Sequence, residues 1–253
     1  MVGAAARRGL GDGGVSVHLV GGGWQDEPDG AAYAEFLAEA AARAAASGRE
    51  MPRIAVVSVR DGDEAEHAAK LVDAASAAAE FEAHVTAVGH DGEIPATAFA
   101  DVDGILVGGG LTPVYRDLLE PHFGELRRQV ASGVPYAGFS AGSVIAAEHA
   151  LVGGWRIGGV PVAPEDASED LDELTIAPGI GLVDVTIDVH VAQWGTLSRL
   201  VSAVEAGLIE RGLGIDELTA LIVGEGGLRV AGHGSVWRVL PAETGVVVST
   251  IGA

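Results

Sequence analysis

Short apolar runs rich in β-branched residues alternate with helical segments over the first 150 residues of this 253-residue chain. The clearest run is RIAVVSV at residues 53–59, a pattern typical of a strand that is buried on both faces. Further strands are predicted at 15–20, 84–88, 104–107 and 135–139, and helices at 29–47, 64–81, 112–119, 122–132 and 141–149. This alternation predicts an α/β fold, a three-layer sandwich in which helices cover both faces of a mostly parallel sheet.

The alternation becomes less regular after residue 150, although no linker or repeat divides the chain. Residues 155–172 combine acidic residues and prolines with few periodic positions, which indicates a long loop over the edge of the sheet. We expect a strand at 182–189, a helix at 196–208, a strand at 220–223 and a C-terminal β-hairpin over 227–250. The predicted organisation is one α/β domain at residues 15–253 after a flexible tail at residues 1–14.

The charge balance argues against several classes of partner. The chain has 36 Asp and Glu residues but only 15 Lys and Arg residues, a net charge of −21, so no basic face is expected for nucleic acid or anionic lipid. No apolar stretch approaches the roughly 18 residues of a membrane-spanning helix, and no signal peptide follows Arg7 and Arg8. We therefore expect a cytoplasmic protein that binds neither nucleic acid nor membrane, with a homodimer left open.

No motif predicts a metal or a cofactor. The chain has no cysteine, which excludes a thiolate nucleophile and Cys-ligated zinc. H-E-x-x-H does not occur, and the Gly21-Gly22-Gly23 run lacks the further glycine or the lysine of a nucleotide-binding loop. The acid-rich stretch 165–173 is typical of a solvated loop, and the alternative is that its acids hold a cationic end of a substrate.

The most informative segment is G-x-S-x-G at residues 138–142, between a predicted strand and a predicted helix. This context is that of a nucleophile elbow, in which a sharp turn exposes the serine hydroxyl at the carboxyl edge of a sheet. Gly138 and Gly142 leave room for the neighbouring backbone. Ser140 is therefore the candidate nucleophile, and the Ala141 N–H at the start of the helix is the candidate first donor to an oxyanion.

A second oxyanion donor is expected from another loop at the same edge of the sheet. Gly108, Gly109 and Gly110 directly follow the strand predicted at 104–107. Consecutive glycines allow a backbone N–H to turn toward the site, and we favour the N–H of Gly110 over that of Gly109. The alternative is that the glycines form a flexible connection without a chemical role.

A serine nucleophile needs a base within hydrogen-bond distance and an acid that orients the base. Among the eight histidines, His190 ends a β-branched run and His233 lies between two glycines. The candidate acids are Asp188, on the same face of the strand as His190, and Asp216 and Glu217, in a turn before a later strand. The spacing alone leaves both the base and the acid undecided.

Four ordered motifs resemble the cyanophycinase and dipeptidase E (aspartyl dipeptidase) family of serine peptidases: VGGG at 107–110, GFSAGS at 138–143, DVH at 188–190 and GIDELTALIV at 214–223. The resemblance implies a class I glutamine amidotransferase-like (flavodoxin-like) fold. It also implies hydrolysis of a peptide or isopeptide bond in a small, Asp-containing peptide through an acyl-enzyme. The implied triad is Ser140 as nucleophile, His190 as base and Glu217 as the orienting acid, without a cofactor.

The chain departs from the family pattern around the expected substrate pocket. Where cyanophycinases typically have Asp-Gln-His-Phe followed by Gln-Arg-Gly-Arg, the chain has DVHV at 188–191 followed by QWGT at 193–196. The glycine run is followed by leucine rather than Asp or Asn. The identity of the substrate is therefore left open, and the candidates for substrate contacts are Gly109, Leu111, Asp188, Gln193 and Trp194.

Two other functions compete with the peptidase. One is an esterase of the α/β-hydrolase type that uses Ser140, Asp188 and His233. The other is a binding module that keeps the fold without catalysis. A glutaminase is disfavoured because its nucleophile is a cysteine, which the chain lacks.

Overall fold

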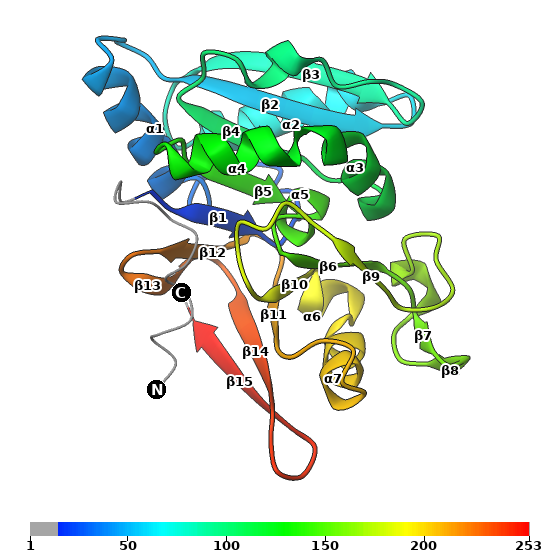
Figure 1. Ribbon diagram of the computed structural model, residues 1–253. Helices are drawn as coiled ribbons and strands as arrows, with labels where there is room; N and C mark the ends of the chain where they lie inside the picture. The colour runs from blue at the N-terminus through cyan, green and yellow to red at the C-terminus, as the bar shows by residue number, and fades with distance from the viewer. Residues whose placement is uncertain (1–14, 253) are drawn as a thin grey trace.

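The centre of the computed structural model, which describes residues 15–252, is a seven-stranded sheet with strand order β13-β12-β1-β5-β4-β2-β3 (Figure 1). Its parallel part consists of β1 (Val17–Val20), β5 (Tyr136–Phe139), β4 (Gly104–Val107), β2 (Arg53–Arg60) and β3 (Glu82–Gly89). β12 (Thr219–Gly224) and β13 (Gly227–Gly232) extend it in antiparallel fashion beside β1. The predicted mostly parallel sheet is confirmed, whereas the tail predicted at 1–14 lies outside the described residues.

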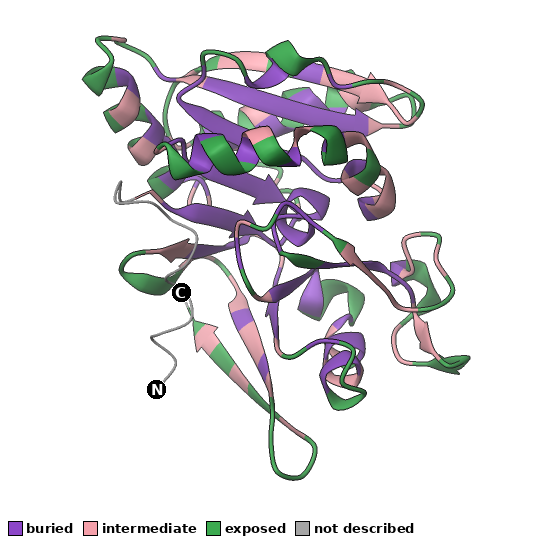
Figure 2. Ribbon diagram, viewed as in Figure 1, coloured by how far each residue is buried: buried purple, intermediate pink, exposed green. Residues whose placement is uncertain are grey.

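Helices cover both faces of the central sheet because successive side chains of its strands point to opposite sides. On one face, α1 (Ala34–Ala46) and α2 (Glu64–Ser76) share a buried cluster with Val56 and Leu106. On the other face, α3 (Thr112–Leu119) and α4 (Phe123–Ala131) pack with the neighbouring strand residues Val57 and Ile105. The inner strands are consequently buried along most of their length (Figure 2).

A second, four-stranded sheet has the order β10-β11-β14-β15 and lies below the central sheet in Figure 1. Its strands are β10 (Thr186–Val189), β11 (Gly212–Ile215), β14 (Ser235–Pro241) and β15 (Val246–Gly252). Ile187, Ile215 and Val236 belong to the same buried cluster as Val17 and Leu19 of β1, so the two sheets share one core. α6 (Val191–Trp194) follows β10, and α7 (Leu197–Glu205) packs against β14.

The predicted C-terminal β-hairpin is present as β14 and β15, but the predicted range of 227–250 begins too early, because it includes a strand of the other sheet. β13 pairs with β12 in the central sheet, whereas β14 and β15 pair with each other in the second. The sequence pattern also misses β11, whose Gly-Leu-Gly-Ile sequence is short and lacks a β-branched run. The second sheet is therefore the main feature of the fold that the strand–helix alternation does not reveal.

The helix predicted at 141–149 is too long. α5 (Ala141–Val144) is followed by β6 (His149–Gly153), which pairs with β9 (Thr175–Pro178). The carbonyls of Ile145 and Ala146 accept the N–H groups of Ile180 and Leu182, and this tertiary pairing overrides the helix propensity of the alanines.

Other predicted bounds also differ in part from the structure. The helix predicted at 64–81 ends at Ser76, and the strand predicted at 182–189 begins at Thr186. The loop predicted at 155–172 contains only short elements, namely β7 (Arg156–Ile157), β8 (Val160–Pro161) and η4 (Glu165–Ala167). Two further 3₁₀ turns are η2 (Ala96–Phe99) and η3 (Glu120–His122).

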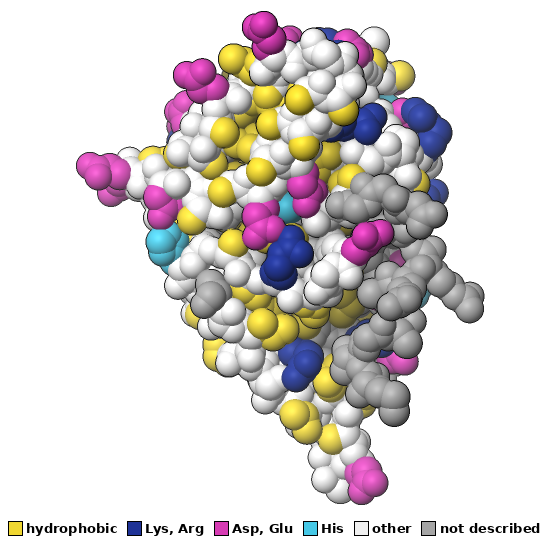
Figure 3. Space-filling model, turned by 90° about the vertical axis from the view of Figure 1, so that its left-hand side faces the viewer, with side chains coloured by type: hydrophobic (Ala, Val, Ile, Leu, Met, Phe, Trp, Pro, Cys, Tyr) yellow, Lys and Arg dark blue, Asp and Glu magenta, His cyan; other side chains and the backbone are white. Residues whose placement is uncertain are grey.

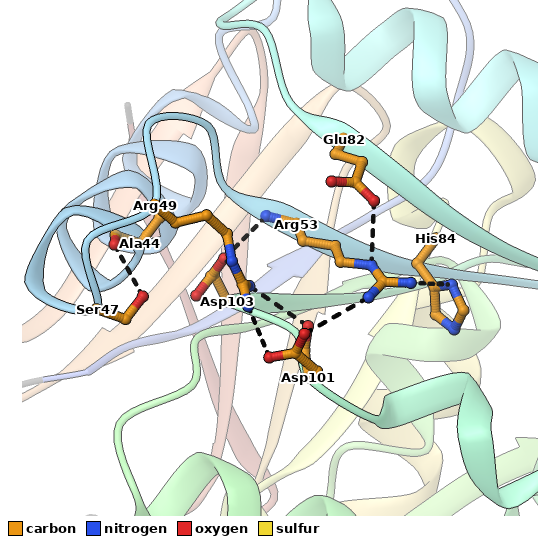
Figure 4. Close-up of polar contacts among 8 residues, drawn as sticks. All are labelled: Ala44, Ser47, Arg49, Arg53, Glu82, His84, Asp101 and Asp103. Carbon is orange, nitrogen blue, oxygen red and sulfur yellow. Dashed lines mark hydrogen bonds and ion pairs between the residues drawn. The ribbon is translucent and has the colours of Figure 1, made fainter.

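A polar network closes the edge of the sheet at which the parallel strands begin (Figure 4). The Asp103 carboxylate, which directly precedes β4, accepts hydrogen bonds from Arg49 Nη1 at 2.8 Å and from the Arg53 N–H at 2.9 Å. Asp103 is buried, whereas Glu82 pairs with Arg53 at 3.3 Å on the exposed side of the same edge. The network therefore ties the loop after α1 to the start of β2 and β4, at the end of the sheet opposite to Ser140.

The face shown in Figure 3 carries separate Lys and Arg side chains with Asp and Glu side chains among them, so the visible described residues form no continuous basic patch there. No helix within residues 15–252 combines the length and the hydropathy that a membrane span needs.

Replacing Asp103 by alanine should lower the free energy of unfolding by about 2–3 kcal/mol, because it leaves the partly buried Arg53 N–H without its charged acceptor. Glu82→Ala is the matched control, since it removes an exposed ion pair at the same edge and should cost no more than about 1 kcal/mol. Urea denaturation of both variants measures the difference. Equal losses of unfolding free energy in Asp103→Ala and Glu82→Ala would contradict the greater contribution to stability that we assign to the buried Asp103 carboxylate.

Candidate active site

Ser140 lies at the sharp turn between β5 and α5, with φ 52° and ψ −111°. This region is sparsely populated for residues other than glycine, so the surroundings must hold the turn. The Ser140 N–H donates to the Val20 carbonyl at 2.9 Å, and the Ser140 carbonyl accepts the Ser143 N–H at 2.8 Å. A Cβ on Gly138 would stand 2.4 Å from the Gly142 carbonyl carbon, which explains why the G-x-S-x-G pattern is needed here.

Three side chains form a hydrogen-bonded chain at this turn. Ser140 Oγ lies 2.8 Å from His190 Nε2, and His190 Nδ1 lies 2.7 Å from Glu217 Oε1. A carboxylate only accepts hydrogen bonds, so these partners place the proton of the neutral ring on Nδ1 and leave Nε2 as the acceptor for the serine hydroxyl. The arrangement is that of a nucleophile, a base and an orienting acid.

His190 reaches Ser140 from the second sheet. It directly follows β10 and has the left-handed conformation, with φ 54° and ψ 34°. Its N–H donates to the Gly21 carbonyl at 3.1 Å, which fixes the end of β10 against the end of β1. The ring therefore owes its position to the junction of the two sheets.

Glu217 lies in the turn between β11 and β12, and its neighbour Asp216 holds that turn in place. The Asp216 carboxylate accepts the Ala192 N–H at 3.1 Å and Trp237 Nε1–H at 2.8 Å. Gln193, predicted as a substrate contact, instead accepts the Glu217 N–H through Oε1 at 3.0 Å. Asp216 and Gln193 thus position the Glu217 backbone, a role that spacing in the sequence does not indicate.

The Gly21-Gly22-Gly23 run packs against the back of this chain of side chains. A Cβ on Gly22 would lie 2.1 Å from His190 Cε1, and a Cβ on Gly23 would lie 2.6 Å from Glu217 Cβ. Both glycines have positive φ, 93° and 84°. Sequence reasoning excluded a nucleotide site here but missed this packing role, for which the only signal was a glycine run directly after a strand.

The loop of Gly108, Gly109 and Gly110 packs against Ser140 and Gly142. The Gly108 carbonyl accepts the Gly142 N–H at 3.0 Å, and a Cβ on Gly109 would lie 2.7 Å from Ser140 Cβ. Among the described residues, neither the Gly110 N–H nor the Ala141 N–H has a protein acceptor. These two N–H groups are therefore free to bind an oxygen atom of a ligand.

His67, on α2, contacts this loop through a hydrogen bond. Its Nε2 accepts the Gly109 N–H at 3.3 Å, so the Gly109 N–H is occupied, whereas that of Gly110 has no acceptor within residues 15–252. The imidazole lies edge-on to Trp24 and Phe139, with ring centroids 5.4 and 6.1 Å away. Burial, with a smaller effect of the nearby Arg60 charge, lowers the pKa of His67 to about 4.

Trp194 stacks on His190. The indole and imidazole rings are 3.9 Å apart and nearly parallel, at 6°, while the indole remains 41% exposed. The ring therefore covers one face of His190 and offers its other side to a ligand. Leu111, the other apolar candidate for substrate contacts, directly precedes α3 and is partly exposed.

Asp188 does not face this site as a free carboxylate. It is fully buried and forms a two-pronged ion pair with Arg199, through Nε at 2.9 Å and Nη2 at 2.7 Å. Arg199 also donates to the Ala167 carbonyl. Because Arg199 occupies both carboxylate oxygens, Asp188 is not placed for the substrate contact or the esterase role that the sequence allowed.

The esterase triad also lacks its base, because His233 is engaged elsewhere. Its Nε2 lies 2.6 Å from Asp29 Oδ2, and both side chains are about half exposed. His190, rather than His233, contacts the Ser140 hydroxyl.

Acids of the 165–173 stretch bind backbone N–H groups. Glu169 accepts the Thr112 N–H at 2.9 Å, and Glu173 accepts those of Gly158 and Gly159 at 2.8 Å. Burial raises the pKa of Glu169, against the opposing effect of the Thr112 N–H. Within residues 15–252, no group of three or more His, Asp or Glu side chains is placed to hold a metal ion.

Comparison with known proteins places the chain in a family. The model of peptidase family S51 matches residues 86–231, which contain Ser140, His190 and Glu217. The chain belongs to peptidase family S51. The resemblance to cyanophycinases and dipeptidase E is thereby confirmed.

Individual relatives match parts of this S51 chain. Cyanophycinase of Synechococcus elongatus is 37% identical over 145 residues, which cover 55% of this chain and 42% of that protein. Peptidase E of Shewanella denitrificans is 42% identical over 69 residues, or 26% of this chain and 29% of that protein. The matched regions thus span less than half the length of these relatives.

A solved structure supports the fold over most of the chain. A peptidase from an acI-B1 actinobacterium superposes with a TM-score of 0.64 at 20% identity, over 96% of this chain and 99% of that chain. At this identity the likeness concerns the fold alone.

The lowered pKa of His67 should make stability depend on pH. The ring titrates near pH 6.5 in the unfolded chain but near 4 in the folded one, so the unfolded state binds its proton first as the pH falls. The contribution of the neutral His67 ring to the free energy of unfolding is therefore complete above about pH 6.5. It is lost as the pH falls toward 4. The nearby charges that also act on the pKa of His67 are those of Arg60 and Lys70, which lower it, and that of Asp63, which raises it.

The measurement is urea unfolding of the native chain and of His67→Gln at pH 7 and at about pH 4.5. The native chain should lose stability relative to the variant at the lower pH, because glutamine does not titrate. A difference in unfolding free energy that stays constant with pH would contradict a neutral, buried His67.

Proposed function

We propose that this S51 chain is a serine peptidase that cleaves a peptide or isopeptide bond in a small peptide through an acyl-enzyme. The single observation that carries the proposal is the chain of contacts from Ser140 Oγ to His190 Nε2 at 2.8 Å and from His190 Nδ1 to Glu217 Oε1 at 2.7 Å. The family match supports the class of bond, since its members are peptidases by name. Ser140, His190 and Glu217 are the proposed triad.

In the proposed mechanism, Ser140 Oγ attacks the carbonyl carbon of the scissile bond while His190 Nε2 takes the hydroxyl proton. Glu217 holds the ring by accepting the Nδ1 hydrogen and stabilises the imidazolium that forms. The imidazolium then gives its proton to the leaving amine, and the acyl group remains on Ser140. A water molecule, deprotonated by the same nitrogen, then attacks the acyl carbon. The bond from this carbon to Ser140 Oγ breaks, the imidazolium returns its proton to Oγ, and the acid product leaves.

The negative charge that develops on the carbonyl oxygen needs donors in fixed positions. We assign this role to the N–H groups of Ala141 and Gly110, which lack a protein acceptor among residues 15–252. Ala141 is also the first residue of α5, and Gly110 directly follows Gly109, on which a Cβ would lie 2.7 Å from Ser140 Cβ.

The proposed substrate is a small Asp-containing peptide, as the resemblance to dipeptidase E and cyanophycinases implies. The exposed face of Trp194, stacked on His190, is the proposed wall of the substrate site. Leu111 and Gly109 are the other proposed contacts with the substrate.

We also assign the fold to the class I glutamine amidotransferase-like group on the same resemblance. The single domain over residues 15–253, the cytoplasmic location and a homodimer stay predictions.

Ser140→Ala should abolish labelling by a fluorophosphonate probe and lower kcat by on the order of 10⁴-fold or more, because no nucleophile remains. Turnover is measured on a library of dipeptides that varies both residues flanking the bond and includes isoaspartyl members. We expect the members with Asp on the acyl side to be cleaved best.

Two outcomes would refute the proposal. A Ser140→Ala variant with near-native turnover would rule out the serine mechanism. A native chain that is neither labelled nor active on any library member would favour a binding module. Cleavage that is indifferent to Asp would overturn the substrate proposal alone.

Glu217→Gln should lower kcat by about 10²- to 10⁴-fold with the fold retained, because the amide can present a donor where the Nδ1 hydrogen needs an acceptor. The matched control is His233→Gln, at a half-exposed histidine that pairs with Asp29, and it should change kcat less than about twofold. Steady-state kinetics on the best dipeptide decides. The reverse order of effects would support the esterase triad instead.

A further inference from the structure

The glycine loop beside Ser140 has to be held in one conformation if it is to supply an oxyanion donor. Gly108, Gly109 and Gly110 follow one another without a side chain, so the backbone itself has wide conformational freedom. The Gly108 N–H donates to the Val57 carbonyl at 2.9 Å and the Gly108 carbonyl accepts the Gly142 N–H at 3.0 Å. These two bonds hold the Gly108 N–H and the carbonyl end of the peptide between Gly108 and Gly109, but neither involves the peptide between Gly109 and Gly110.

The third bond to the loop comes from a side chain outside the triad. His67 Nε2 accepts the Gly109 N–H at 3.3 Å and lies 3.0 Å from where a Cβ on Gly108 would stand. The bond holds the N–H end of the peptide between Gly108 and Gly109, so this peptide, whose carbonyl end binds the Gly142 N–H, is fixed at both ends. The next N–H in the chain, that of Gly110, is left without a protein acceptor among the described residues.

The position of the imidazole is itself fixed by two aromatic rings. Trp24 meets it edge-on at 5.4 Å, and Phe139, the residue before Ser140, lies 6.1 Å away. Trp24 also packs on Phe139, with ring centroids 4.6 Å apart. His67 is only 7% exposed, so rotation of its ring away from Gly109 would require these neighbours to move. Burial lowers the pKa of His67 to about 4, which keeps Nε2 available as an acceptor at neutral pH.

We propose that His67 is a positioning residue for the oxyanion site: by accepting the Gly109 N–H it fixes the glycine loop so that the Gly110 N–H points toward the carbonyl oxygen of the substrate. This inference rests on the proposed serine peptidase function. It gives a chemical purpose to a histidine that neither contacts the triad nor belongs to the motifs shared with the family.

The test separates acceptance of a hydrogen bond from mere filling of space. His67→Leu and His67→Met remove the acceptor but keep an apolar side chain against Trp24 and Phe139. His67→Gln keeps an acceptor, its amide oxygen, at a similar distance from the backbone. The readouts are the rate of fluorophosphonate labelling of Ser140, kcat and KM on the best dipeptide, and the thermal midpoint of each variant.

We expect His67→Leu and His67→Met to slow labelling and lower kcat by about 10- to 100-fold, since one oxyanion donor is worth about 10²- to 10³-fold. KM should stay within about twofold, because the donor acts on the transition state. His67→Gln should restore labelling and kcat to within about fivefold of the native values. The matched control is His122→Leu, which also removes a histidine that bonds to the backbone, here at the Ile94 carbonyl, and it should leave both rates unchanged.

The outcomes distinguish this inference from the proposed function. If the native chain is not labelled at Ser140, the serine mechanism fails first. If the native chain is labelled and folded His67→Leu or His67→Met reacts at the native rate, His67 does not position the loop. A folded His67→Gln as slow as His67→Leu would also overturn the inference, because it would show that the acceptor is not what matters.

Discussion

The hydrogen bond between Ser140 and His190 joins the two sheets of the molecule, and the geometry of the candidate site depends on it. Ser140 follows β5 of the central sheet, whereas His190 follows β10 of the second. Glu217 lies in the turn that connects the two sheets, between β11 and β12. Contacts of 2.8 and 2.7 Å require the sheets to dock with little tolerance, because a shift of about 1 Å is enough to misalign such groups.

Close docking is possible because side chains are missing where the sheets meet. A Cβ on Gly21 would lie 2.1 Å from the Asp216 carbonyl oxygen, and a Cβ on Gly22 would lie as close as 2.1 Å to the His190 ring. Buried polar contacts hold the second sheet from its own side, above all the ion pair of Asp188 with Arg199. Breaking a buried ion pair strongly destabilises a protein, because it leaves a buried charge without a partner. The pair therefore suits a position that must not move.

The parts of the site that depend on neighbouring residues could be predicted from the sequence, and the parts that depend on docking could not. The turn at Ser140 follows from G-x-S-x-G between a strand and a helix. The choice of His190 over His233 depends on a contact across 50 residues, and only the family resemblance pointed to it. The second sheet escaped because β11 carries glycines where a strand pattern needs β-branched residues. Likewise, nothing near Gly22 in the sequence signals a histidine 168 residues away, because a close approach leaves no periodic pattern.

The most direct test of this account is a crystal structure of the chain after reaction with a fluorophosphonate. The account predicts a covalent bond from phosphorus to Ser140 Oγ, with the phosphoryl oxygen within about 3 Å of the N–H groups of both Gly110 and Ala141, and with His190 still bonded to Glu217. Phosphorus bound to another residue, or a phosphoryl oxygen directed to solvent while the glycine loop keeps its place, would contradict the assignment of the site.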